Sequence, residues 1–219
     1  MFVGHYSAAI AAKAAEPRAP FWALAGACQL IDIAWSVFII TGVEDAQVDH
    51  SLPGSPLVLS DMPWTHSLPA ALIWSIAAAL AAKPLLKLAW PVAIVIGATV
   101  FSHWLLDLLV HRPDLALWPG GPKIGFGLWD YEVPEQAVEI GLIAIAAVYW
   151  GASRRAAGAA STPPALFIAL LLALQITAMF MPPEDIPLQM GGMSLAVYLV
   201  VVLAAVLADR RPGPGRGPG

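Results

Sequence analysis

The chain has 219 residues, of which 59% are hydrophobic and only 12% are charged, and its mean hydropathy is +0.74. Soluble domains have an apolar share of about 45–50%, so this composition excludes an ordinary soluble protein and indicates an integral membrane protein. The net charge of −4, with scattered basic residues, excludes a nucleic-acid-binding surface. Because Cys28 is the single cysteine, no intramolecular disulfide can form.

Six apolar runs are long enough to cross a membrane, which takes about 17–25 helical residues each. We therefore predict an all-α fold, a polytopic membrane bundle of about six transmembrane helices with a short N-terminal helix. Residues 1–209 form one domain with its polar cluster in residues 1–150, and residues 210–219 form a flexible tail of Pro, Gly and Arg. The predicted spans are Phe21–Thr41, His66–Ala82, Leu88–Val110, Pro134–Trp150, Pro164–Met181 and the marginal Ser194–Ala208.

The connections between these runs alternate in charge. Basic residues flank one set of ends: Lys13, Arg18, Lys83, Lys87, Arg154, Arg155, Arg210, Arg211 and Arg216. Acidic residues occupy the opposite connections: Glu44, Asp45, Asp49, Asp61, Asp130, Glu132, Glu184 and Asp185. Because basic residues mark the cytoplasmic side, we expect both termini in the cytoplasm. The outer connection 111–134, rich in Gly, Pro and Trp, is expected to form turns and an interfacial cap.

The N-terminal segment VGHYSAAIAAKAAEP predicts a short helix that ends before Pro17. Two placements of this helix are open. If it dips back into the membrane, it brings His5 to the depth of Asp32, and its alanines allow close packing against other helices. If it lies flat on the cytoplasmic surface, His5 has no part in a site.

The third span carries three polar residues at steps of four, in the stretch TVFSHWLLDLLVHRP: His103, Asp107 and His111. This spacing places all three on one helical face. Ionisable groups are costly inside a bilayer, so their presence favours a functional role. A structural alternative is that Asp107 and His111 lie at the solvated end of the helix, where they form hydrogen bonds with the loop.

Other spans carry ionisable groups at comparable depths. Counted at about 1.5 Å of helical rise per residue from the flanking basic residues, Asp32, His66 and Glu139 come to the same outer half of the membrane as His103. Simpler interpretations exist for two neighbouring groups. His66 follows Thr65, a candidate N-cap, and Glu135 suits the positive N-terminal end of its helix. The common depth nevertheless predicts one shared site.

Imidazoles and carboxylates are ligands of divalent metals, with zinc preferred and manganese or iron also compatible. A bound cation would also neutralise carboxylates in a medium of low dielectric constant. His103 and His111 are about 12 Å apart along the helix axis, so His103 with Asp107 is the better pair. His111 is left as a supporting residue, a ligand of a second metal or an interfacial anchor. Glu139 is the candidate catalytic residue, as the general base.

Several stretches carry a resemblance: F-V-G-H-Y with Lys13, Q-L-I-D-I-A-W, W-T-H-S-L, S-H-W-L-L-D-L-L-V-H-R-P-D and L-W-P-G-G. Together they resemble a family of small bacterial inner-membrane proteins described as membrane-bound metal-dependent hydrolases, from the N-terminus to about Trp150. The resemblance implies a bacterial inner (plasma) membrane location and one set of metal ligands: His5, Asp32, His66, His103 and Asp107. Similar His and Asp usage in zinc-dependent phospholipases C favours a lipid or phosphoester substrate by analogy.

The sequence thus predicts a membrane-embedded, metal-dependent hydrolase that acts on an amphiphilic ester or phosphoester near the outer face. One alternative is a non-catalytic subunit of a larger membrane complex, whose nine tryptophans contact lipid or protein. Another is a transporter or proton pathway, which also uses buried carboxylates and histidines. The expected partners are membrane lipid, a lipid-like substrate and a larger complex, but no nucleic acid.

Overall fold

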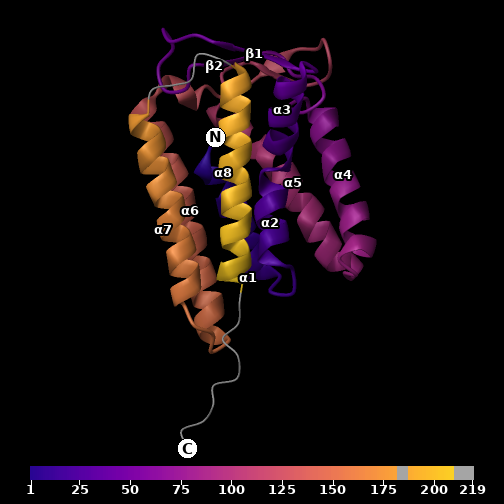
Figure 1. Cartoon of the computed structure of the whole chain (residues 1–219), viewed down its shortest axis with the longest axis vertical. Coiled ribbons are helices and arrows are strands. Elements are labelled where there is room, and N and C mark those ends of the chain that lie inside the picture. The colour runs from indigo at the N-terminus through magenta and orange to yellow at the C-terminus, as the bar shows by residue number, and fades with distance from the viewer. Residues whose placement is uncertain (182–186, 210–219) are drawn as a thin grey trace, which may run out of the picture.

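The computed structural model describes residues 1–181 and 187–209, which form an all-α helical bundle with two small two-stranded sheets at one end (Figure 1). The predicted fold class is confirmed. Two expectations lie outside the described residues. One concerns the tail 210–219, which contains Arg210, Arg211 and Arg216, and the other concerns the charges of Glu184 and Asp185. The helices are α1 (Tyr6–Ala15), α2 (Phe21–Cys28), α3 (Leu30–Thr41), α4 (Leu68–Leu85), α5 (Trp90–Val110), α6 (Glu132–Ala156), α7 (Thr162–Phe180) and α8 (Pro187–Ala208).

Within the described residues, the five helices α4 to α8 are long and apolar enough to cross a membrane, and the bent pair α2 and α3 brings the number to six. The predicted number of spans therefore agrees with the structure. Some predicted spans were shorter than the helices of the structure. For example, α6 runs from Glu132 to Ala156, whereas the predicted span was Pro134–Trp150. The first and last turns of α6 are polar, so a prediction based on hydropathy did not include them although they are helical.

The first predicted span, Phe21–Thr41, was wrong as one continuous helix. The chain bends by 54° between α2 and α3, where Gln29 leaves the helical conformation at φ −111° and ψ 7°. Broken helices at membrane depth are stable only where protein groups satisfy the freed backbone. Here the Cys28 carbonyl oxygen lies 2.7 Å from the Nδ1 atom of His103, so the break supplies a partner for that imidazole.

Of the two placements left open for the N-terminal segment, the structure has it inside the bundle. A short 3-10 helix, η1 (Val3–His5), leads into α1, and His5, Tyr6 and Ile10 are fully buried. Figure 1 shows the N-terminus between the long helices rather than at a surface. At the far end of α1, Lys13 Nζ lies 2.7 Å from Asp209 Oδ1 and bonds two backbone carbonyls.

Side chains from two spans hold the first residues of this segment. Glu139 Oε1 accepts a hydrogen bond from the Phe2 amide at 2.6 Å, and its Oε2 accepts one from the Gly4 amide at 2.7 Å. Gln29 Nε2 donates to the Phe2 carbonyl at 3.1 Å. A Cβ atom at Gly4 would overlap the Met1 side chain, so glycine leaves room for Met1 there. The Phe2 and Gly4 amides and the Phe2 carbonyl thus have partners inside the bundle.

The connections at the other end form a cap, of which only the part in residues 111–134 was predicted, as turns; the structure has short strands in both parts. Strands β1 (Asp45–Val48) and β2 (Leu57–Asp61) pair antiparallel, as do β3 (Leu115–Ala116) and β4 (Lys123–Ile124), and a second 3-10 helix, η2 (Leu128–Asp130), leads to α6. Arg112 joins the two halves of the cap, with Nε 2.7 Å from Asp130 Oδ1 and Nη2 2.6 Å from the Pro53 carbonyl. The polar cluster lies below this cap.

Candidate metal centre

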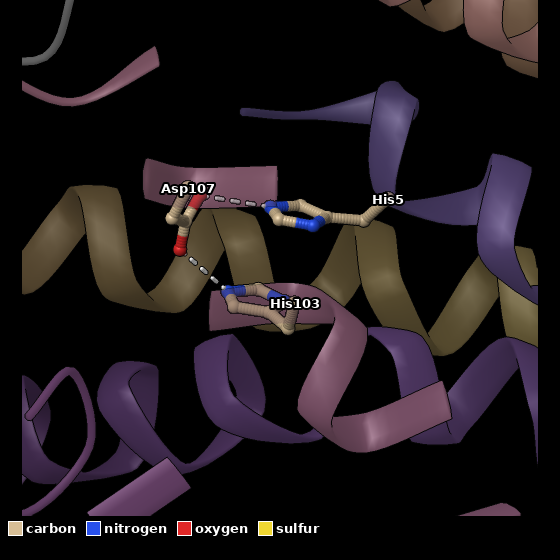
Figure 2. A group of neighbouring side chains, drawn as sticks. All are labelled: His5, His103 and Asp107. Atoms are coloured by element: carbon tan, nitrogen blue, oxygen red, sulfur yellow. Dashed lines mark ion pairs between the residues drawn. The ribbon is translucent and has the colours of Figure 1, made fainter. Parts of the chain in front are cut away.

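Asp107, near the C-terminal end of α5, lies at the centre of the polar cluster and is only 1% exposed. Its Oδ2 atom lies 3.1 Å from His103 Nε2 and 3.8 Å from His66 Nε2. Its Oδ1 atom lies 3.1 Å from His5 Nε2 and 3.7 Å from His111 Nε2. Figure 2 shows His5 and His103 approaching the two different oxygens of this carboxylate. The N-terminal ammonium of Met1 also donates to Oδ1 at 3.1 Å, so four imidazoles and one ammonium surround this buried carboxylate.

Asp32, in the first turn of α3, supplies the second carboxylate. Its Oδ1 atom lies 3.2 Å from His103 Nε2 and 3.3 Å from His66 Nε2. Its Oδ2 atom accepts a hydrogen bond from the Tyr198 hydroxyl of α8 at 2.9 Å. Tyr198 was not among the predicted site residues, because a lone tyrosine in an apolar run gives no sign of its tertiary partner.

The structure thus brings together all five residues predicted as ligands. They form two groups that share His103, and within each group the ligand atoms lie within 4.8 Å of one another. The groups are His5, His103 and Asp107, and Asp32, His66 and His103. Their elements are distant in the sequence, so convergence at this point is a tertiary property. That they bind a metal stays a prediction.

The hydrogen bond made by His103 fixes which ring nitrogen faces the cluster. The Cys28 carbonyl oxygen can only accept, so His103 Nδ1 carries the proton and donates it. When the ring is neutral, its Nε2 atom has a lone pair that faces the Asp32 and Asp107 oxygens, which also only accept. Neither His103 Nε2 nor Asp107 Oδ2 has a hydrogen-bond partner among the described residues, although both are buried. A cation fits between these atoms, either a proton on Nε2 or a metal ion.

His66 has the same orientation for a different reason. Its Nδ1 atom lies 2.7 Å from Thr65 Oγ1, and the Thr65 hydroxyl donates to Glu44 Oε2 at 2.6 Å. Because that hydroxyl proton goes to Glu44, the Thr65 oxygen accepts from His66 Nδ1–H, and the Nε2 lone pair faces Asp32. The interpretation of Thr65 as an N-cap was wrong, since the Ser67 side chain accepts the cap bond from the Ala70 amide.

His111 directly follows α5 and is also held through Nδ1. That atom lies 3.0 Å from Asp114 Oδ1, and the ring packs on Trp129 with centroids 3.9 Å apart. Burial lowers the pKa of His111, although Asp107 and Asp114 act in the opposite direction. In the neutral ring with Nδ1–H donated to Asp114, the Nε2 lone pair faces Asp107.

Glu139, the predicted general base, is 1% exposed and lies one helical turn from Glu135 on α6. Both of its carboxylate oxygens accept backbone amides of the N-terminal segment, so its visible contacts hold His5 in position. Its role as a base stays a prediction. Glu135 lies in the first turn of α6, as the interpretation from helix polarity requires, and its Oε2 accepts from Gln136 Nε2 at 2.8 Å.

A cavity of about 760 Å³ adjoins the cluster and is lined by residues of α3, α6, α7, α8 and the cap. Its lining includes Asp32, His66, Asp107 and His111 of the cluster. The other polar lining residues include Glu135, Gln136, Glu139 and Gln175. Four methionines also line it: Met179, Met181, Met190 and Met193. The cluster is therefore accessible to a ligand with both polar and apolar parts.

Comparisons with protein-family models, curated proteins and solved structures gave no match. The family resemblance therefore stays a prediction, and the function has to be argued from the site.

Proposed function

We propose that the protein is a membrane-embedded, metal-dependent hydrolase that cleaves an amphiphilic ester or phosphoester. The observation that carries this proposal is the excess of buried acceptors around His103. The lone pairs of His103 Nε2 and His66 Nε2 face the Oδ1 atom of Asp32 at 3.2 and 3.3 Å. One proton on an imidazole satisfies one such contact, whereas one divalent cation satisfies all of them.

The donor set favours zinc, because neutral imidazoles and carboxylates are its usual ligands, and manganese or iron would also fit. When bound, the ion would lower the pKa of water to about 7 and polarise the scissile bond. The chain's own residues have the other tasks. Cys28, Thr65 and Asp114 orient the imidazoles, and Glu139 holds the N-terminal segment that carries His5.

The adjoining cavity supports an amphiphilic substrate. Its four lining methionines are apolar and adaptable, which suits a hydrocarbon chain. Its lining also has carboxyl and amide groups of Glu135, Gln136 and Gln175, and among the described lining residues none is Lys or Arg. A head group that donates hydrogen bonds, either neutral or cationic, therefore fits this lining better than a strongly anionic one.

We also propose that the cap faces outward in a bacterial inner membrane. The acidic residues Glu44, Asp45 and Asp61 belong to the cap. Lys83 and Arg154 lie in the last turns of α4 and α6, and Figure 1 shows these helices ending away from the cap. This distribution follows the positive-inside rule. An Asp49→Cys variant tests this orientation, because residue 49 lies on the cap side. We expect an impermeant thiol reagent to label it in intact cells; labelling only after lysis would show that the cap faces the cytoplasm.

The function is tested on the full chain, purified in detergent and loaded with zinc. We expect bound zinc by elemental analysis and hydrolysis of long-chain ester or phosphodiester lipids in mixed micelles. A chelator should remove both, and zinc should restore both. His103→Ala should lose both, whereas His50→Ala, in an exposed loop, should keep both. Absence of bound metal in the unaltered protein would overturn the proposal, as would hydrolysis that survives chelation.

Glu44→Gln is expected to weaken zinc binding about 10–100-fold, the usual cost of losing an outer partner of a ligand histidine. The amide would donate to Thr65, whose hydroxyl would then donate to His66 Nδ1 and transfer the ring proton to Nε2. Zinc titration of the metal-free protein measures this effect. Asp45→Asn, an exposed change of the same charge in the next residue, is the matched control. Equal affinity in the two variants would contradict the role of Glu44.

A further inference from the structure

The cavity beside the metal centre has an excess of carboxyl groups. None of its described lining residues is Lys or Arg, whereas five of them are acidic: Asp32, Asp107, Glu132, Glu135 and Glu139. Three of the five have partners that account for their charge. The Met1 ammonium, which also lines the cavity, lies 3.1 Å from Asp107 Oδ1. Asp32 belongs to the candidate metal centre, and both oxygens of Glu139 accept backbone amides. Glu132 and Glu135 are left.

Glu135 is the buried member of this remaining pair, with 5% exposure, whereas Glu132 is exposed. It lies four residues before Glu139, so the two carboxyl groups share one face of α6. Like charges at this spacing repel each other, and a buried carboxylate without a cation is costly in a medium of low dielectric constant. A cation that enters the cavity from outside would remove both costs.

A chain of side-chain amides in the same lining shows that a hydrogen-bond donor is also missing. Because a carboxylate only accepts, Gln136 presents its Nε2 atom to Glu135 Oε2, at 2.8 Å. The Oε1 atom of Gln136 then accepts from Gln175 Nε2 at 2.6 Å, which orients the second amide as well. Gln175 lines the cavity at 2% exposure, and its Oε1 atom is a buried acceptor without a hydrogen-bond partner among the described residues.

We propose that this cavity binds the primary ammonium group of an amphiphilic substrate, with Glu135 as its ion-pair partner and Gln175 as a hydrogen-bond acceptor. An –NH₃⁺ group has both a positive charge and three N–H donors. A quaternary ammonium has the charge without a donor, and a hydroxyl group has a donor without the charge. The same cavity is lined by His66 and Asp107 of the metal centre, so one molecule can contact both places. This inference rests on the proposed function and adds the head group of its substrate.

The first test measures binding to the full chain, purified in a neutral detergent and kept metal-free with a chelator. The probes are three labelled amphiphiles with the same alkyl chain: dodecylammonium, dodecyltrimethylammonium and dodecanol. We expect dodecylammonium to bind about tenfold more tightly than the other two, and Glu135→Gln to weaken its binding about 10–100-fold, because a charge-assisted hydrogen bond is lost. Asp49→Asn, the same loss of charge on an exposed loop of the cap, should have no effect.

Gln175→Leu separates the hydrogen bond from the charge. It should weaken the binding of dodecylammonium about 3–10-fold and leave that of dodecyltrimethylammonium unchanged, since only the primary group donates to Gln175. Circular dichroism establishes that each variant is folded. If a variant fails to fold, the comparison of the three head groups on the unaltered protein still decides the matter.

The second test uses the zinc-loaded protein and two lipid esters that differ only in the head group. The kcat/KM value for the ester with a primary ammonium should exceed that for the matched hydroxyl compound about tenfold. Glu135→Gln should remove this preference while the zinc content stays unchanged. Hydrolysis of the two esters at equal rates would contradict the assigned head group without contradicting the hydrolase.

The outcomes separate this inference from the proposed function. Equal binding of dodecylammonium and dodecanol would overturn the inference, because Glu135 would then carry a proton in place of the cation. Equal binding of the quaternary probe would overturn it too, as would unchanged dodecylammonium binding by Glu135→Gln. Each of these results leaves the hydrolase proposal standing. Selective binding of dodecylammonium by a protein that takes up no zinc would support the ammonium site and overturn the hydrolase.

Discussion

Asp107→Asn is expected to abolish metal binding and hydrolysis together, with the largest effect of any single substitution in the cluster. All four histidines of the site lie within 3.8 Å of this carboxylate. The amide keeps the shape of the side chain but removes its charge, and its nitrogen cannot ligate a cation. Since the loss of an outer-shell partner costs about 10–100-fold in metal affinity, the loss of this shared ligand should cost more.

The measurement is zinc content after dialysis, combined with lipid hydrolysis by the same preparation. Asp49→Asn is the matched control, because it makes the same change on an exposed loop, where the carboxylate accepts hydrogen bonds from Ser51. Helical content by circular dichroism establishes that each variant is folded. If the Asp107→Asn protein kept its full zinc content, the prediction would be wrong. Either the other residues of the cluster would then bind zinc without Asp107, or zinc would bind elsewhere in the protein.

Glu139→Gln is expected to destabilise the fold and weaken metal binding together. The carboxylate accepts two buried amides, those of Phe2 and Gly4, and an amide side chain has only one oxygen to accept them. A buried donor left without a partner costs about 1–3 kcal/mol, so the melting temperature should fall measurably. Because the same segment carries His5, the affinity for the metal should fall as well.

This substitution also tests the sequence-based role of Glu139 as general base. If Glu139 acted only as a base, the Glu139→Gln protein would lose hydrolysis while its melting temperature and zinc content stayed unchanged. That outcome would contradict the anchoring role inferred from the two hydrogen bonds. Glu132→Gln, an exposed change in the first turn of the same helix, is the control for altered charge at this end of α6.

The convergence of the polar residues could be predicted because depth in a membrane follows from sequence. Helical rise per residue is constant, and basic residues mark one end of each span, so residue number translates into height. This argument brought His103, Asp32 and His66 to one level, and the structure has them in contact. It gives no rotation about the helix axis, so it could not say which atoms face one another.

Groups outside the spans could not be found in this way. Glu44 lies 21 residues before Thr65, through which it acts on His66, and no spacing rule connects a loop carboxylate with that imidazole. Asp114 follows His111 by three residues but lies in a turn, so a helical pattern does not relate them. His111 seemed too far from His103 along the helix, and the structure shows that both reach the two oxygens of the same aspartate.

The sequence by itself determined the class of fold and the chemical character of the site. Hydropathy identified the spans, and the cost of burying ionisable groups marked the residues of the site. Only the tertiary structure decided the placement of the N-terminal segment, because its burial depends on Glu139 and Gln29 of other helices. The break at Gln29 also depends on tertiary structure, because the Cys28 carbonyl beside it has its partner in His103. SHWLLDLLVHR thus supplies half of the cluster, and the packing of distant segments supplies the rest.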